Sequence, residues 1–214
     1  MKKSSPAYLS GRTPGSEQRH SRRMFWGIAT PVSAMLPQFI QTGMFRASAT
    51  SDPVTLLTFH ALIGIAFLTG LLVYPLQQGP DLPATPVNVT TRFWAFVFDM
   101  MAWSILVTPV VIAIALLLPD PSATGVQALM PILMLSLVVR SVRSVTTGQA
   151  SFGQRIMSYR TIARKNPIRT GIVNTVLAML AHAGAFFTLL LAITPKAQPA
   201  WWNRVSGVEA ISTD

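Results

Sequence analysis

The feature that most constrains the fold of this chain is an apolar run from Val54 to Leu76, which holds 23 residues without a formal charge. A helix needs about 20 predominantly apolar residues to cross the hydrocarbon core of a bilayer. The composition agrees, because 50% of the 214 residues are hydrophobic and only 11% are charged. A chain of this kind buries itself in lipid rather than around one aqueous core. The sequence therefore predicts an all-α fold, a polytopic bundle of transmembrane helices.

Further apolar runs extend this bundle. Phe93 to Leu118 and Gly171 to Thr194 are long enough to cross, and Gly125 to Val139 is at the short end of the usual range. Met24 to Phe45 is also long enough, although prolines and glutamines interrupt it. We predict that residues 24–77 form N-terminal membrane segments and that they follow a disordered, basic N-terminus at 1–23.

Charge placement decides how many segments cross. Residues 1–23 carry six basic side chains against one acid, and residues 140–169 carry seven with no acid, so both regions are expected in the cytoplasm. A crossing at 24–45 brings the two regions to the same face of the membrane. The sequence thus predicts about five spans, or four if 24–45 does not cross. With five spans the N-terminus lies inside and the tail after Thr194 lies outside.

The N-terminal apolar segment has a second interpretation. The sequence "SRRMFW" at 21–26 is similar to a twin-arginine export signal, and the small residues at 47–49 provide a cleavage site. Paired arginines before a first span are equally the ordinary positive flank of a membrane helix. The segment 24–45 is therefore a span, an interfacial helix or a cleaved export signal.

Basic residues dominate the charge of the chain. Lys and Arg number 17 against 7 acids, but they flank apolar runs instead of forming a soluble basic domain, so nucleic acid is not an expected partner. Phe152 to Lys165 places apolar residues on one helical stripe with basic residues around it, which is typical of an amphipathic helix lying on anionic lipids. The predicted partner is an anionic bilayer, and the predicted basic cytoplasmic surface comprises Arg140, Arg143, Arg155, Arg160, Arg164 and Lys165.

One acid, Asp99, lies inside an apolar run, and Arg92 precedes it by two helical turns on the same face. A carboxylate in lipid is costly, so its side chain must face the bundle or water. It serves either as a proton or cation site or as a structural ion pair with Arg92 or Arg140. Asn174 is expected near the same end of its own helix. Arg92, Asp99 and Asn174 therefore form the predicted intramembrane polar site.

The same residues carry a family resemblance. "RFWAFVFD", from Arg92 to Asp99, resembles the opening of a transmembrane helix in the RDD family of bacterial membrane proteins. "TTGQASFGQRIMSYRTI" at 146–162 is similar to that family's glycine-containing loop, with Gln154 where a lysine is common. "WWNRVSGVEAI" at 201–211 is similar to its closing segment, with Asn203 where a second aspartate is expected. The resemblance covers about residues 90–211.

The resemblance implies a multi-pass protein of the bacterial inner membrane, for which transport of a ligand is the usual proposal. The residues themselves show no catalytic constellation, no metal-ligand spacing, no phosphate loop and no cysteine, so we expect no enzyme activity, cofactor or metal. We expect an accessory subunit that packs against other membrane subunits or against itself. The alternative is a transporter or ion-coupled carrier that uses Arg92 and Asp99.

Overall fold

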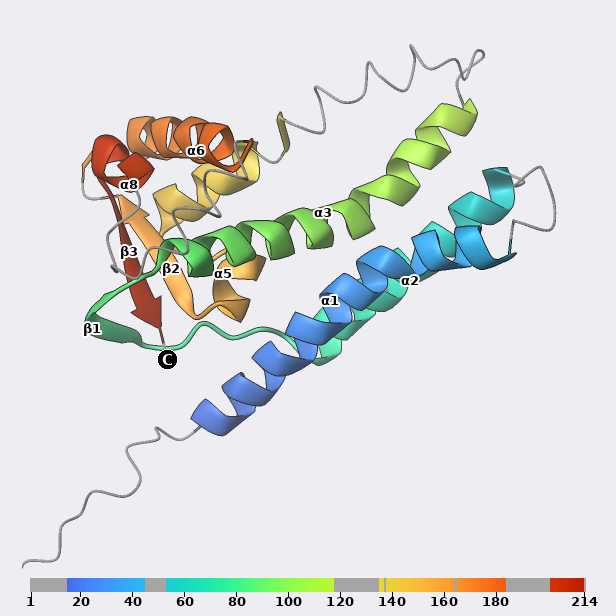
Figure 1. Ribbon diagram of the computed structural model, residues 1–214, viewed down its shortest axis with the longest axis horizontal. Helices are drawn as coiled ribbons and strands as arrows, with labels where there is room; N and C mark the ends of the chain where they lie inside the picture. Colours follow the sequence, from blue (N-terminus) through green and yellow to red (C-terminus); the bar gives the residue numbers. More distant parts are fainter. Residues whose placement is uncertain are drawn as a thin grey trace, which may run out of the picture.

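The computed structural model describes residues 15–44, 53–117, 135–136, 138–163, 165–183 and 201–213. Helices account for most of these residues, and three strands form a small sheet (Figure 1). The elements are, in chain order, α1 (Ser16–Met44), α2 (Pro53–Val73), β1 (Asp81–Pro86), α3 (Val89–Leu117), α5 (Phe152–Ile156), β2 (Tyr159–Ala163), α6 (Pro167–Ala183), α8 (Trp201–Ser206) and β3 (Val208–Thr213). Residues 138–147 are helical as well.

The long helices follow the apolar runs of the sequence. Among the described residues, α2 over Val54–Val73 and α3 over Val89–Leu117 are long and apolar enough to cross a membrane, and Pro167–Leu180 of α6 is a shorter apolar helix. The prediction of a mainly helical protein is therefore confirmed, and two of the predicted spans are helices long and apolar enough to cross; the total of about five spans stays a prediction. The helix α1 begins at Ser16, so residues 16–23 belong to a helix and the prediction of disorder there is wrong.

A tryptophan of α1 lies at the centre of the helical core. Trp26 is only 2% exposed, and its ring packs edge to face against Phe67 of α2 and Phe152 of α5, with centroids 5.1 and 6.0 Å apart. Its indole Nε1 donates a hydrogen bond to the Tyr74 carbonyl oxygen at 2.8 Å. Gly70 makes room for the indole, because a Cβ at that position lies 3.0 Å from the ring. This cluster joins α1, α2, α3 and α5.

The three strands form an antiparallel sheet in the order β1-β3-β2. Residues that are distant in sequence are paired, for example Ile162 with Glu209 and Asp81 with Thr213. The sheet lies at one end of α3, and α5, α6 and α8 surround it (Figure 1). The sheet contradicts a purely α-helical fold.

Two sequence predictions fail because of this sheet. The predicted surface helix over Phe152–Lys165 ends at Ile156, since Ser158 adopts a left-handed φ of 58° and residues 159–163 then pair with β3. The predicted outward tail is also wrong. Strand β3 belongs to that tail and pairs with β2 of the basic segment, so both lie on the same side of any membrane.

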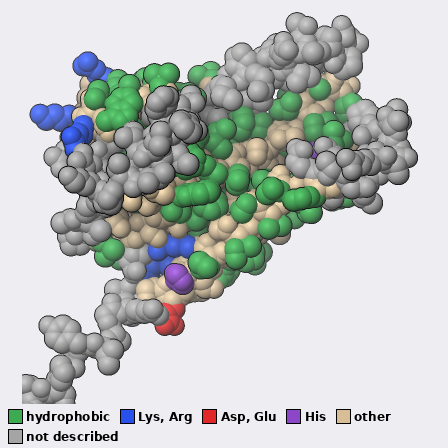
Figure 2. All heavy atoms as spheres, viewed as in Figure 1, with side chains coloured by type: hydrophobic (Ala, Val, Ile, Leu, Met, Phe, Trp, Pro, Cys, Tyr) green, Lys and Arg blue, Asp and Glu red, His purple; other side chains and the backbone are tan. Residues whose placement is uncertain are grey.

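The described surface divides into an apolar and a polar part. Hydrophobic side chains lie along α1 and α2 beyond the charged start of α1, and the basic side chains in view lie at that start and at the upper left, near α6 and α8 (Figures 1 and 2). Large apolar side chains such as Leu62, Leu72 and Val73 of α2 and Leu117 of α3 are exposed. This division is the one expected of helices in lipid that carry a polar end in water.

Candidate functional site: a cavity beside α3

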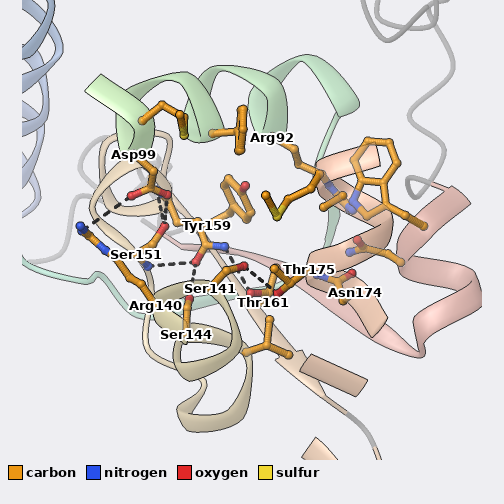
Figure 3. Close-up of a pocket in the computed structure, with 18 residues that line it drawn as sticks. Arg92, Asp99, Arg140, Ser141, Ser144, Ser151, Tyr159, Thr161, Asn174 and Thr175 are labelled. Atoms are coloured by element: carbon orange, nitrogen blue, oxygen red, sulfur yellow. Dashed lines mark hydrogen bonds and ion pairs between the residues drawn. The ribbon is translucent and has the colours of Figure 1, made fainter. Parts of the chain in front are cut away.

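A cavity of about 370 Å³ lies where α3 meets the sheet end of the molecule. Its walls come from α3, residues 140–145, the α5 region, β2, α6 and α8 (Figure 3). The lining residues are Arg92, Phe96, Asp99, Met100, Arg140, Ser141, Ser144, Val145, Ser151, Gln154, Tyr159, Thr161, Asn174, Thr175, Ala178, Met179, Trp202 and Asn203. The structure thus brings the three residues of the predicted polar site, Arg92, Asp99 and Asn174, to one cavity.

Asp99 is held by the beginning of α5. The Ser151 hydroxyl donates to Asp99 Oδ2 at 2.5 Å, and the Gly153 amide donates to Asp99 Oδ1 at 2.9 Å. The Arg140 Nη2 atom lies 3.9 Å from Asp99 Oδ1, and the carboxylate side chain is 23% exposed. These contacts connect α3 to α5 and to residues 138–147 (Figure 3).

The turn that presents these donors is fixed by a capping box. Ser151 is the N-cap of α5 and accepts a hydrogen bond from the Gln154 amide, while Gln154 Oε1 accepts from the Ser151 amide at 3.0 Å. Gln154 Nε2 also donates to Thr161 Oγ1 of β2 at 3.2 Å. Gly153 is required at its position, because a Cβ there overlaps the Ala95 carbonyl oxygen of α3. The loop therefore reaches Asp99 only through a close backbone approach.

Arg92 lies in a different environment from Asp99. Its side chain is 5% exposed, and its Nε and Nη1 atoms are buried without a hydrogen-bond partner among the described residues. Nearby, burial raises the pKa of the Tyr159 phenol, so Tyr159 is neutral at physiological pH. The structure does not pair Arg92 with Asp99, whose bonds run to Ser151, Gly153 and Arg140.

Asn174 of α6 lies on the side of the cavity opposite Asp99 (Figure 3). Its Oδ1 atom accepts a hydrogen bond from Ser206 Oγ at 3.0 Å, and this bond joins α6 to α8. Asn203, also on α8, lines the cavity with a side-chain Nδ2 atom that is buried and has no partner in the described structure.

The six residues of the predicted basic surface do not form one exposed face. Arg155 turns inward and donates to the carbonyl oxygens of Ala150 and Leu76, each at 3.0 Å. Arg160 forms an ion pair with Asp81 of β1, and Arg140 approaches Asp99. Arg143 and Lys165 are exposed, and Arg164 lies outside the described residues.

Sequence reasoning missed several residues of the cavity: Ser151 and Gln154 as a capping box, Tyr159 and Thr161 of β2, and Trp202 and Asn203 as wall residues. One signal for the capping box was available, because "SFGQ" matches the Ser-x-x-Gln pattern of a helix N-terminus. The wall residues of β2 and α8 carry no local signal, since their positions depend on pairing between distant strands.

The apolar helices, the polar end and the cavity define an α-helical membrane protein with a small sheet on one side. The RDD family model matches residues 86–197. The chain belongs to the RDD family, and the resemblance inferred from its sequence is confirmed. A search of curated proteins and a search of solved structures found no match.

Proposed function

We propose that this chain is a non-catalytic packing subunit of a larger membrane complex in the bacterial inner membrane. The observation that carries the proposal is an apolar stripe on the outer face of α1. Ile28 and Phe39 in this stripe are 63% and 64% exposed. The stripe comprises Met24, Phe25, Ile28, Val32, Met35, Leu36 and Phe39. The helix α1 lies outside residues 86–197, so the stripe is an addition to the family region.

The composition of α1 favours a protein partner over lipid for this stripe. Among the described helices, α2 and α3 meet the length and apolarity of a span, and α1 does not. The helix α1 contains Pro31 and Pro37, and its polar Thr30 is fully buried against the rest of the molecule. A helix that is too polar for lipid around its whole surface gains stability when another protein covers its apolar face.

The topology that accompanies this proposal places the polar end in the cytoplasm. Arg22 at the start of α1 donates to the Pro75 carbonyl oxygen at 2.9 Å, so the N-terminal arginines lie beside the end of α2. The basic segment and β3 share this end, in accord with the positive-inside rule. Under this proposal α1 is not cleaved off as an export signal, because cleavage would remove Trp26 from the hydrophobic core. The strand β3, which pairs with β2 of the basic segment, is then cytoplasmic as well.

A carrier function is the second candidate, and the cavity beside α3 favours it. Asp99 is the acid within α2 and α3 that could hold a proton or cation, yet its oxygens already accept hydrogen bonds from Ser151 and Gly153. An ion that bound to this carboxylate would compete with the contacts that hold α5 in place. The packing role is therefore the better supported of the two.

Site-specific photo-crosslinking in native membranes tests the packing role. A photoreactive amino acid at Ile28 or Phe39 should give a discrete adduct with one other membrane protein, because the stripe faces that partner. The same amino acid at Leu62, an exposed position on α2, serves as the lipid-facing control. Lipid adducts alone at all three positions would refute the proposal, and an adduct of twice the chain mass would replace the hetero-complex with self-association.

A further inference from the structure

Arg92 carries a positive charge that the described part of the protein leaves without a partner. Its guanidinium is buried, and its Nε and Nη1 atoms donate a hydrogen bond to no acceptor among the described residues. The nearest acid along α3, Asp99, is occupied by Ser151, Gly153 and Arg140. Tyr159 is neutral and supplies no counter-charge. A buried cation in this state costs free energy unless an anion reaches it.

A second unsatisfied donor faces the same cavity. Asn203 is 3% exposed, and its Nδ2 atom has no hydrogen-bond partner within the described ranges. Its position is fixed by α8, which the bond between Ser206 and Asn174 attaches to α6. A charged donor and a neutral donor from two different elements therefore line one space of about 370 Å³.

We propose that this cavity binds an oxyanion, a carboxylate or a phosphate, that is attached to an apolar group. The oxyanion accepts hydrogen bonds from Arg92 and Asn203. The apolar group fits against Phe96, Met100 and Met179 of the wall. The cavity volume falls within the range of about 300 to 1,000 Å³ that is usual for small-ligand sites.

Charge restricts the ligand further. The lining holds Arg92, Arg140 and Asp99, and the pair formed by Arg140 and Asp99 leaves one positive charge in excess. A monoanion neutralises that excess, whereas a neutral molecule does not. Two sources offer such a group: a free amphiphilic acid and the headgroup of an anionic phospholipid. The site does not depend on a packing role, so a failed crosslink at α1 leaves this proposal standing.

Calorimetric titration of the full chain in an uncharged maltoside detergent tests the proposal. Sodium octanoate represents the free acid, short-chain phosphatidylglycerol represents the headgroup, and short-chain phosphatidylcholine is the control without net charge. At least one of the two anions should bind, and the one that binds identifies the source. Absence of binding by both anions, or equal binding of phosphatidylcholine, would overturn the proposal.

Single substitutions test whether the anion binds in the cavity. Arg92→Gln should weaken anion affinity by about tenfold or more, the size expected for loss of a charge-assisted hydrogen bond. Arg143→Gln removes an exposed charge outside the cavity and should leave the affinity unchanged. Equal affinity in Arg92→Gln and in the unmodified protein would contradict the site.

A substitution of the second donor gives an independent measurement if Arg92→Gln fails to accumulate. Asn203→Asp places a carboxylate in the cavity as an internal partner for Arg92. This variant should bind the anion at least about tenfold more weakly. Its thermal midpoint without ligand should rise, because the guanidinium then has a counter-ion. Undiminished anion affinity in Asn203→Asp would refute the assignment.

Discussion

At the residue scale, the structure gives Asp99 and Arg92 different roles although they share a helix face. The sequence allowed an ion pair between them, or between Asp99 and Arg140. The structure contains the pair with Arg140, at 3.9 Å, and adds two hydrogen bonds to Asp99 from Ser151, the N-cap of α5, and Gly153 in its first turn. Two hydrogen bonds to an ionised acceptor are strong in a partly buried site. Arg92 is consequently free to face the cavity.

Gly153 provides a test at this scale, because it allows the loop to approach α3. Gly153→Ala places a methyl group on the Ala95 carbonyl oxygen, and backbone atoms on both sides prevent a cheap adjustment. We predict a loss of stability of about 1 to 3 kcal/mol, as for overpacking in a core. Thermal unfolding in detergent measures it.

Gly27→Ala is the matched control for Gly153→Ala. A Cβ at Gly27 meets nothing within 4 Å, and Gly27 lies within the helix α1. The control should be neutral or more stable by up to about 1 kcal/mol, because Ala is the better helix former. Equal stability of the two variants would contradict the close approach of α5 to α3.

At the element scale, the length of the apolar runs in the sequence predicts the long helices well but gives no indication of the sheet. The runs from Val54 and Phe93 correspond to α2 (Pro53–Val73) and α3 (Val89–Leu117), because a predominantly apolar run of that length is stable in lipid as a helix, in which all backbone groups are hydrogen-bonded. The apolar residues Phe152, Ile156 and Tyr159 of the predicted surface helix are buried, but they belong to the short helix α5 and the strand β2. Its partner strand lies far along the chain, and local periodicity does not record distant pairing.

The pairing of β2 with β3 is tested by a cysteine pair. Ile162 and Glu209 are direct partners, and opposite residues of an antiparallel pair have Cβ atoms about 4.5 to 5.5 Å apart. Ile162→Cys with Glu209→Cys should form a disulfide when isolated membranes are oxidised. The chain has no native cysteine to interfere.

A shifted cysteine pair provides the control for this register. Ile162→Cys with Ser212→Cys should remain reduced, because Ser212 pairs with Tyr159 instead. If neither pair forms a disulfide in membranes, the tail does not lie beside the basic segment. The outward tail that the sequence predicts would then be restored.

At the scale of the whole molecule, the chain combines an apolar helical part with a polar end that is closed by the C-terminal strand. The family region at 86–197 holds the α3 residues that line the cavity, whereas α1 and α2 precede it and complete the core through Trp26 and Phe67. Asp99 lies where the two parts meet, since it is on α3 and accepts hydrogen bonds from the N-cap and first turn of α5. We therefore infer that Asp99 is a structural connection between the membrane helices and the polar end.

Two further variants serve as controls for the loss of stability expected of Asp99→Asn. Asp81→Asn removes the ion pair with Arg160 and should cost less than about 1 kcal/mol, because the Asp81 side chain is more exposed than that of Asp99, at 42% against 23%. Arg92→Gln should not rescue Asp99→Asn, because Arg92 is not bonded to Asp99.

The most direct measurement of the central claim is the stability of Asp99→Asn, taken together with ion flux in proteoliposomes. The substitution keeps the size of the side chain but removes its charge and turns an amide donor toward Ser151 or Gly153. We predict a loss of about 2 kcal/mol or more in unfolding free energy, and lower accumulation in the membrane, because charge-assisted hydrogen bonds are lost. We also predict no Asp99-dependent ion flux in the unmodified protein. Unchanged stability of Asp99→Asn, together with flux that the unmodified protein supports and the variant abolishes, would contradict the account and establish a carrier.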